Sequence, residues 1–317
     1  MSVKGTRISG LGVYRPGRLV GNEELAARAG VDPEWIQGGT GIATRYHADA
    51  AENVVSMAIA AGKQALEAAK VAPDEVDLVI LTTATRRQLA PAGAPQVATG
   101  LGIPAAGAFD LGAVCAGFSY ALSMASNAVA VGQARNVLIT SSERLTDVID
   151  PENPDTFVIF GDGAGAAVVS PSNEWGIGPV SWGSDGSRAS VIEIQVREGT
   201  KDLATMDGQI VYRWATSKMP EVAKHACELA GVSLGEIKWF VPHQANRRIV
   251  DMLASRLGFV SAQVARDVID TGNTSSATIP LALHRLYENS EVQYGDLALL
   301  IGFGSGLSHA AQVVRLS

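Results

Sequence analysis

The run DLGAVCAGFSYAL (residues 110–122) holds the first residue that could do chemistry, Cys115. It follows small residues and stands just before an apolar helical pattern. At a helix N-terminus, unsatisfied N–H groups and the helix dipole stabilise a thiolate, so we expect its pKa to lie below the ordinary value of about 8.5. Cys115 would then be a nucleophile; the alternative is a buried structural thiol. Cys227 lies within an Ala-rich helical pattern and is expected to be structural.

Two other residues could supply proton donors. His243 follows the apolar run KWFVP, at the carboxyl end of a predicted strand, where ligand crevices open in α/β sheets. A neutral imidazole there could polarise a carbonyl group or move a proton, although a histidine hydrogen-bonded in a loop is the structural alternative. Asn273 lies in the polar turn DTGNTSSATIP. Its amide could donate to an oxygen that develops charge, or it could cap the following helix.

A glycine-rich run, GFGSGLSH (residues 302–309), could complete such a site. The backbone N–H of Ser305 or Gly306, with that of Cys115, could form an oxyanion hole. The same run is weak evidence for a dinucleotide site, because no βα unit with a trailing acidic residue accompanies it. The two distant cysteines and the absence of clustered histidines predict neither a disulfide framework nor a metal site.

The elements that must position these residues follow an α/β pattern. Apolar runs of strand length alternate with Ala-rich helical segments: helices are predicted over residues 54–70 and 115–132, and strands over 76–84 and 136–142. The strands are nearly continuous in Val, Leu and Ile, which indicates sheets covered by helices on both faces. The sequence therefore predicts a layered α/β fold.

An internal repeat divides this fold into two halves. Residues 69–85 align with residues 230–246, and the same offset pairs Cys115 with Ser276. A polar stretch near residues 170–190 separates the copies, so we predict halves of residues 1–170 and 171–317 that share one core. A site at their junction would take Cys115 from the first half and His243, Asn273 and Ser305 from the second.

Composition excludes several function classes. The chain has 317 residues, 47% hydrophobic and 18% charged, as expected for a soluble enzyme. Its apolar runs are shorter than the roughly 18 residues of a membrane span, and its first residues lack a secretory signal pattern, so we expect a cytoplasmic protein that does not bind membranes. A net charge of −7 without a dense Lys/Arg run argues against a nucleic acid ligand.

The runs CAGFSYAL, FGDGAGAAVV, VPHQAN, GNTSSATIP and FGSG, in this order, resemble the β-ketoacyl-acyl carrier protein synthase III family of thiolase-like condensing enzymes. The resemblance covers nearly the whole chain. It implies duplicated βαβαβαββ halves stacked as a five-layer αβαβα core, a homodimer, and an acyltransferase that initiates fatty acids or polyketides. Its substrates would be acyl and malonyl thioesters of coenzyme A or acyl carrier protein, with no cofactor.

The resemblance also implies a catalytic triad of Cys115, His243 and Asn273. Cys115 would take an acyl group from a thioester, with the oxyanion held by the amides of Cys115 and Ser305. His243 and Asn273 would then donate to the thioester carbonyl of a malonyl group that loses carbon dioxide, and the carbanion would attack the acyl-Cys115. Two rival functions are plain acyl transfer to an alcohol or amine, with His243 as base, and a silent partner subunit. Intact Asn273 and Cys115 count against them.

The sequence departs from the family pattern around the nucleotide. Trp35 matches the tryptophan that stacks on the adenine of coenzyme A, but Gly39 replaces the arginine usual before TGI. A second usual arginine, before the TxxIFGDG run, is replaced by Pro154 or Asp155. No neutral residue reproduces the stacking and forked hydrogen bonds of arginine. We therefore expect weak coenzyme A binding and a donor carried by acyl carrier protein, or an unusual acyl-CoA.

Other matches concern the carrier protein and the acyl group. Arg213, Arg248 and Arg256 fall where the family carries basic residues that meet the acidic carrier protein. Leu89 or Ala90 lies in a loop that in the family crosses the dimer interface and often offers an aromatic side chain to the partner's acyl pocket. The smaller side chain here predicts a longer, branched or bulkier acyl group.

Overall fold

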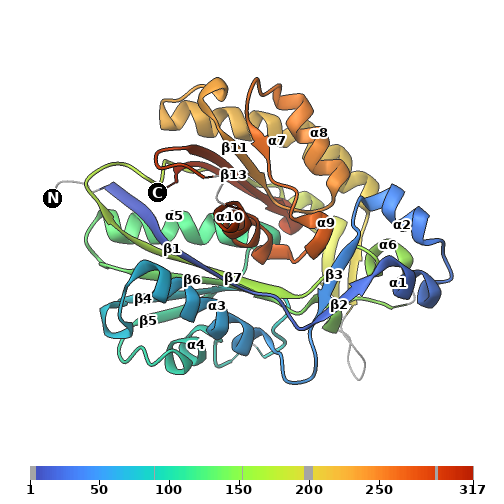
Figure 1. Cartoon of the computed structure of the whole chain (residues 1–317), viewed down its shortest axis with the longest axis horizontal. Coiled ribbons are helices and arrows are strands. Elements are labelled where there is room, and N and C mark those ends of the chain that lie inside the picture. Colours follow the sequence, from blue (N-terminus) through green and yellow to red (C-terminus); the bar gives the residue numbers. More distant parts are fainter. Residues whose placement is uncertain (1–4, 89, 152, 196–202, 290–291, 317) are drawn as a thin grey trace.

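The computed structural model describes residues 5–88, 90–151, 153–195, 203–289 and 292–316. Figure 1 shows five layers, in which helices and sheets alternate from the bottom of the view to the top. The core is therefore split into apolar layers between each sheet and the helices that cover it. The predicted layered α/β fold is confirmed.

Two five-stranded sheets form the second and fourth layers. In spatial order the first contains β1 (Gly5–Tyr14), β7 (Gly163–Ser172), β6 (Val137–Glu143), β4 (Leu78–Thr82) and β5 (Gly107–Leu111). The second contains β8 (Ser181–Ser184), β14 (Ser308–Arg315), β13 (Leu297–Gly304), β11 (Trp239–Pro242) and β12 (Gln263–Val264). In each sheet the first two pairings are antiparallel and the last two are parallel. The sheets thus repeat one topology, as the internal repeat predicted.

Helices fill the remaining three layers. The first sheet is covered on its outer face by α3 (Val54–Ala69) and α4 (Ala94–Gly100), and the second by α7 (Gly208–Ala230) and α8 (Arg247–Leu257). Between the sheets lie α5 (Gly117–Ala130) and α10 (Thr278–Glu288), which start from equivalent positions in the two copies. Because α5 packs against strands of both sheets, most of its residues are buried.

Smaller elements extend from the layered core. One two-stranded sheet pairs β2 (Arg18–Gly21) with β3 (Thr44–His47), and another pairs β9 (Ile192–Gln195) with β10 (Leu203–Met206). The remaining α-helices of the described chain are α1 (Asn22–Ala29), α2 (Pro33–Thr40), α6 (Pro154–Phe157) and α9 (Val268–Thr271). Within the described ranges, no helix is both long and apolar enough to cross a membrane.

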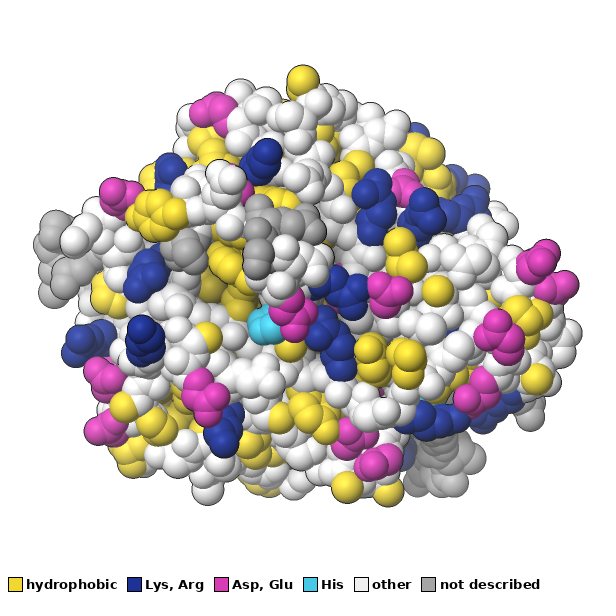
Figure 2. Space-filling model, viewed as in Figure 1, with side chains coloured by type: hydrophobic (Ala, Val, Ile, Leu, Met, Phe, Trp, Pro, Cys, Tyr) yellow, Lys and Arg dark blue, Asp and Glu magenta, His cyan; other side chains and the backbone are white. Residues whose placement is uncertain are grey.

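Charge is unevenly distributed on the surface. Although the net charge is −7, Figure 2 shows Lys and Arg side chains gathered on one face over α8. The sequence of α8, RRIVDMLASRL, supplies three of the cations and a single carboxylate. This cationic face adjoins α2 and α7, whose side chains line a cavity of about 1140 Å³.

Candidate active site

Cys115 lies where the two halves meet. It belongs to a short 3₁₀ turn, Val114–Ala116, directly before α5, as predicted. Val114 has φ 44°, a conformation that a β-branched residue rarely adopts outside tight functional turns. Gly304, at the end of β13, packs against this turn: a Cβ added there would lie 2.7 Å from the Cβ and 3.0 Å from the Sγ of Cys115. Glycine is needed for this close approach.

The predicted low pKa of Cys115 is wrong. Burial raises the pKa of this thiol to about 12, the Ser275 hydroxyl opposes the rise through a hydrogen bond, and the charge of Glu143 adds to it. Only 9% of Cys115 is exposed, so desolvation of a thiolate outweighs the favourable helix end. Cys115 therefore rests as a thiol, and its reaction with a thioester needs an acceptor for the proton.

His243 is held as a neutral ring. Its backbone N–H donates to Ile301 O at 2.7 Å, which fixes it just beyond β11 beside β13. Burial lowers its pKa to about 3, and its ring meets Phe303 edge-on with centroids 5.3 Å apart. The imidazole is therefore uncharged throughout the ordinary pH range.

The hydroxyl of Thr278 decides which nitrogen of His243 carries hydrogen. Thr278 Oγ1 lies 2.7 Å from Nδ1 of His243 and 3.0 Å from the carbonyl oxygen of Ser275. If the hydroxyl donates to Nδ1, Nε2 carries the hydrogen and can donate to a substrate. If it donates to Ser275 O, Nδ1 donates to the hydroxyl and Nε2 offers a lone pair instead.

Asn273 is oriented by its own backbone neighbours. Its N–H donates to Ile159 O and its carbonyl accepts from Gly161 N, both at 3.0 Å. Its side-chain Oδ1 accepts from the N–H of Ser275 at 2.8 Å. Because Oδ1 is engaged, Nδ2 is the side that Asn273 offers to a ligand.

Ser275 connects the three sequence-predicted residues. Its hydroxyl lies 3.6 Å from Sγ of Cys115, its N–H donates to Asn273, and its carbonyl oxygen lies 3.0 Å from the hydroxyl oxygen of Thr278, which contacts His243. The structure therefore brings Cys115, His243 and Asn273 into one buried hydrogen-bond network.

The predicted oxyanion donors follow β13, the strand whose last residue packs against Cys115. Ser305 and Gly306 lie in a short turn, Ser305–Leu307, directly after Gly304. The Ser305 hydroxyl donates to Ile192 O at 2.6 Å, which leaves the backbone N–H as the group of Ser305 that could serve an oxyanion. That role of Ser305 and Gly306 remains a prediction.

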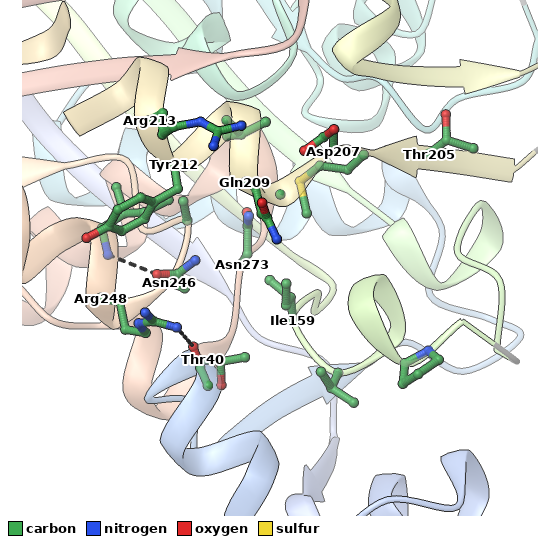
Figure 3. Close-up of a pocket in the computed structure, with 18 of the residues that line it drawn as sticks. Thr40, Ile159, Thr205, Asp207, Gln209, Tyr212, Arg213, Asn246, Arg248 and Asn273 are labelled. Atoms are coloured by element: carbon green, nitrogen blue, oxygen red, sulfur yellow. Dashed lines mark hydrogen bonds between the residues drawn. The ribbon is translucent and has the colours of Figure 1, made fainter. Parts of the chain in front are cut away.

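A cavity of about 1140 Å³ leads to Asn273 (Figure 3). Trp35 on α2, Arg213 on α7 and Arg248 on α8 line it, as does Asn273; Cys115 and His243 do not. The guanidinium of Arg248 lies 5.9 Å from the centroid of the Tyr212 ring, and its Nη1 donates to Gly39 O at 3.4 Å. The wall thus combines aromatic and cationic groups.

Of the other predicted binding residues, one does not line this cavity, one is exposed and one lies outside the described residues. Arg256 is not among the lining residues; its Nη1 donates to Thr216 O at 2.9 Å, between α8 and α7. Ala90 is exposed, and Leu89 lies outside the described residues. Gly39 and Pro154 line the cavity, and a Cβ on Gly39 would have no heavy atom within 4 Å.

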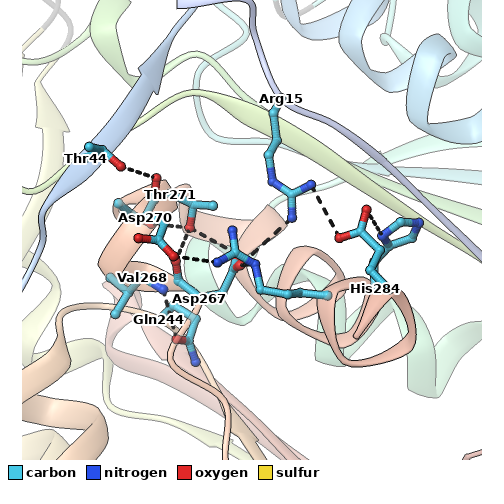
Figure 4. Close-up of polar contacts among 11 residues, drawn as sticks. Arg15, Thr44, Gln244, Asp267, Val268, Asp270, Thr271 and His284 are labelled. Atoms are coloured by element: carbon cyan, nitrogen blue, oxygen red, sulfur yellow. Dashed lines mark hydrogen bonds and ion pairs between the residues drawn. The ribbon is translucent and has the colours of Figure 1, made fainter. Parts of the chain in front are cut away.

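A buried ion pair anchors the segment that carries Asn273 (Figure 4). Asp267 precedes α9, is 3% exposed, and has Oδ1 at 2.5 Å from Nε of Arg285. Arg15, which follows β1, approaches the same oxygen at 3.9 Å. Arg285 also pairs with the exposed Asp270 at 2.7 Å. Since Asp267 lies between Arg285 of the second half and Arg15 of the first, it helps join the halves beside Asn273.

Three residues of the network escaped the sequence analysis. Ser and Thr in a polar turn such as GNTSSATIP usually cap a helix or stabilise the turn, so their residue types did not indicate the contacts of Ser275 and Thr278. Glu143 ends the apolar strand β6 and is fully buried. An acidic residue at the end of such a strand was the available signal, because acidic side chains are seldom fully buried. In the described part of the chain, no group of three or more His, Cys, Asp or Glu could hold a metal ion.

Comparison with known proteins identifies the class to which this fold and site belong. Two family models, 3-oxoacyl-[acyl-carrier-protein] synthase III and its C-terminal counterpart, match residues 109–186 and 227–316. The chain is 46% identical to β-ketoacyl-[acyl-carrier-protein] synthase III 4 of Streptomyces coelicolor, over 98% of this chain and 99% of that protein. It is 44% identical to synthase III 2 of Streptomyces avermitilis, with 99% of each chain covered.

Solved structures agree with the sequence relatives. The priming β-ketosynthase of the R1128 polyketide pathway superposes with a TM-score of 0.97 at 44% identity, covering 99% of this chain and 97% of that chain. The synthase III of Aquifex aeolicus gives 0.94 at 36% identity, covering 98% and 100%. The chain therefore belongs to the 3-oxoacyl-[acyl-carrier-protein] synthase III family, as its motifs predicted. It has the thiolase-like five-layer fold and is an acyltransferase of the condensing type.

Replacing Asp267 should show how much more a buried ion pair contributes to the free energy of unfolding than an exposed one. We expect Asp267→Ala to lower the free energy of unfolding by about 3–5 kcal/mol, because Arg285 and Arg15 lose a buried carboxylate. The matched control Asp270→Ala removes the exposed partner of Arg285 and should cost under about 1 kcal/mol. Urea unfolding of the three proteins measures both values, and equal losses in the two variants would contradict this assignment.

The neutral state of His243 should appear in the pH dependence of stability. The folded pKa of about 3 lies below the unfolded value of 6.5, so the unfolded chain binds the proton first and stability is lost as pH falls below 6.5. The loss for one such histidine reaches about 1.4 kcal/mol per pH unit. Between about pH 6 and 4.5, His243→Gln should therefore lose stability less steeply than the wild type. His47, whose pKa burial lowers to about 4, remains in both proteins and cancels in the comparison. Parallel stability curves would show that His243 is not held neutral.

Proposed function

We propose that this condensing enzyme works through Cys115, His243 and Asn273, and joins an acyl group to malonyl-acyl carrier protein with loss of carbon dioxide. The product would initiate a fatty acid or polyketide chain. The observation that carries the proposal is the Ser275 network, because it joins one thiol and two neutral donor groups, of which Asn273 lines the cavity.

The first half-reaction is acylation of the thiol. The sulfur of Cys115 attacks the thioester carbon, and the backbone amides of Cys115, Ser305 and Gly306 stabilise the oxyanion. Gly304 supports this assignment because it brings the Ser305 turn against the sulfur. The donor leaves as a thiol and the acyl group stays on Cys115.

The second half-reaction is decarboxylation followed by carbon–carbon bond formation. Nε2 of His243 and Nδ2 of Asn273 donate to the thioester carbonyl of the malonyl group, which stabilises the enolate formed when carbon dioxide leaves. The carbanion attacks the acyl carbon and Cys115 is released. A neutral His243 suits this task, since the hydroxyl of Thr278 can assign its hydrogen to Nε2. The names of the relatives favour condensation over plain acyl transfer or a silent subunit.

The acyl donor is proposed to arrive on acyl carrier protein. Gly39 leaves open space where an arginine clamp for coenzyme A would stand, and Pro154 supplies no charge at the second clamp position. Meanwhile Arg213 and Arg248 line the cavity, and cations gather over α8 (Figure 2). An acidic carrier protein docked on this face would deliver its thioester toward Asn273.

The assembly is proposed to be a homodimer in the cytoplasm. β5 is the edge of the first sheet, and its residues Phe109 and Leu111 are only partly buried. An open sheet edge is usually covered or paired, and a second copy of β5 is a suitable cover. The reduced thiols of Cys115 and Cys227 suit a reducing compartment.

Intact-protein mass spectrometry tests the nucleophile and the condensation together. After incubation with a panel of acyl thioesters, wild type should gain one acyl mass on Cys115 and Cys115→Ala should gain none. Asn273→Ala should still be acylated but should release carbon dioxide from a malonyl thioester about 10²–10³ times more slowly, because one of two carbonyl donors is lost. Acylation at another residue, or normal carbon dioxide release by Asn273→Ala, would refute the proposal.

The donor preference is tested by charge reversal on the cavity wall. We expect wild type to acylate faster from acyl carrier protein than from coenzyme A. Arg248→Glu should raise the KM for the carrier-protein donor about tenfold at low salt and less at high salt, because salt screens the attraction. The matched control Lys63→Glu reverses a charge on α3, on the opposite outer layer, and should change this KM less than about twofold. Equal acylation rates from both donors would overturn the preference.

A further inference from the structure

Glu143 is a buried carboxylate that the mechanism above does not use. It ends β6 with no exposed surface, and within the described chain no cation forms a salt bridge with it. Neutral donors hold both oxygens. Oε2 accepts from Ala84 N at 2.9 Å, Thr85 Oγ1 at 2.9 Å and Thr83 Oγ1 at 3.2 Å, and Oε1 accepts from Ser276 Oγ at 2.8 Å and Ser275 Oγ at 3.1 Å. A buried carboxylate held this way without a counter-ion needs an explanation.

One of these donors links Glu143 to the nucleophile. The hydroxyl of Ser275 accepts from Sγ of Cys115 at 3.6 Å and donates to Oε1 of Glu143 at 3.1 Å. A hydroxyl that accepts one hydrogen bond and donates another can pass a proton along the pair. Ser276 donates to the same oxygen but has no recorded contact with Cys115. The path from sulfur to carboxylate therefore runs through Ser275.

We propose that Ser275 and Glu143 form the route by which the thiol proton leaves Cys115 during acylation and returns when the product forms. This inference rests on the proposed function, since it assumes that Cys115 is the nucleophile. Glu143 thereby acts through Ser275 and is a positioning and proton-holding residue.

The proton balance of the proposal closes over one turnover. As the sulfur bonds to the acyl carbon, its proton moves to Ser275 Oγ and the proton of that hydroxyl moves to Glu143 Oε1. The thiolate of the donor leaves and takes a proton from solvent. In condensation the malonyl carbanion bonds to the acyl carbon and the Cys115–acyl bond breaks. The sulfur anion then recovers its proton from Glu143 through Ser275, so one solvent proton is consumed, as loss of carbon dioxide from a carboxylate requires.

The electrostatics of the site favour this carboxylate as the acceptor. Burial raises the pKa of Glu143, although hydrogen bonds from Ala84, Ser276, Thr85 and Ser275 oppose the rise. A thiolate and a carboxylate in the same dry site repel each other, so the pair prefers to keep one proton between them. Burial also lowers the pKa of His243, which makes its ring a poor acceptor for the thiol proton.

The two neighbouring serines offer a matched test. Single-turnover acylation of Cys115 by an acyl-carrier-protein donor can be monitored by mass spectrometry. Its rate should fall about 10²-fold in Ser275→Ala, because the thiol proton loses its path to Glu143. Ser276→Ala removes a hydrogen bond to the same carboxylate oxygen and should stay within about threefold of wild type. Equal slowing in both variants would mean that the serines only support Glu143 structurally, and would refute the route.

A second readout follows the proton itself. Wild-type acylation should be nearly independent of pH between about pH 6 and 9, whereas Glu143→Gln should acylate slowly and about tenfold faster for each pH unit, since hydroxide must then remove the thiol proton. Glu143→Asp should restore part of the flat profile. A flat, unslowed profile in Glu143→Gln would overturn the proposal. If Glu143→Gln fails to fold, the comparison of Ser275→Ala with Ser276→Ala tests the proposal instead, and equal slowing in those two variants would overturn it. If wild type itself shows no adduct on Cys115, the proposed function fails, which is a separate outcome.

Discussion

The site depends on the contacts of one serine. Ser275 adopts φ 50°, unusual for a residue with a side chain, and is 1% exposed. In that conformation its hydroxyl, N–H and carbonyl point to three different partners, which lead to Cys115, Asn273 and His243. Such a conformation persists only where its surroundings fix it, and here a turn of the second half packs against the end of α5 from the first. The duplication of the fold therefore has a chemical consequence, because neither half contains the whole network.

Burial sets the electrical state of each group in that network. It holds His243 neutral, so the ring can act as a donor, and it keeps Cys115 protonated at rest. A low local dielectric also strengthens each hydrogen bond within the site. The same burial would penalise any charge left without a partner, and Glu143 tolerates its position because five donors surround it. The two proposed donors to the substrate, His243 and Asn273, therefore carry no formal charge themselves.

Much of this was accessible from the sequence. The alternation of apolar runs and helical segments predicted the layers, the repeat predicted two sheets of one topology, and the motifs around Cys115, His243 and Asn273 predicted which residues meet. The remainder depends on contacts across the chain. Ser275 touches residues 160 and 132 positions away, and local patterns carry no information about such contacts. The pKa of Cys115 was mispredicted because a helix end is visible in a sequence and desolvation is not. The sequence could not show that the guanidinium of Arg256 donates to the carbonyl of Thr216 within α7, 40 residues away.

The central claim is that two neutral donors converge on one oxygen of the substrate. A crystal structure with a malonyl thioester analogue that cannot decarboxylate tests this directly. The account predicts the thioester oxygen about 3 Å from both Nε2 of His243 and Nδ2 of Asn273, with Nδ1 still bonded to Thr278. An oxygen bound elsewhere, or either donor turned away from it, would contradict the account.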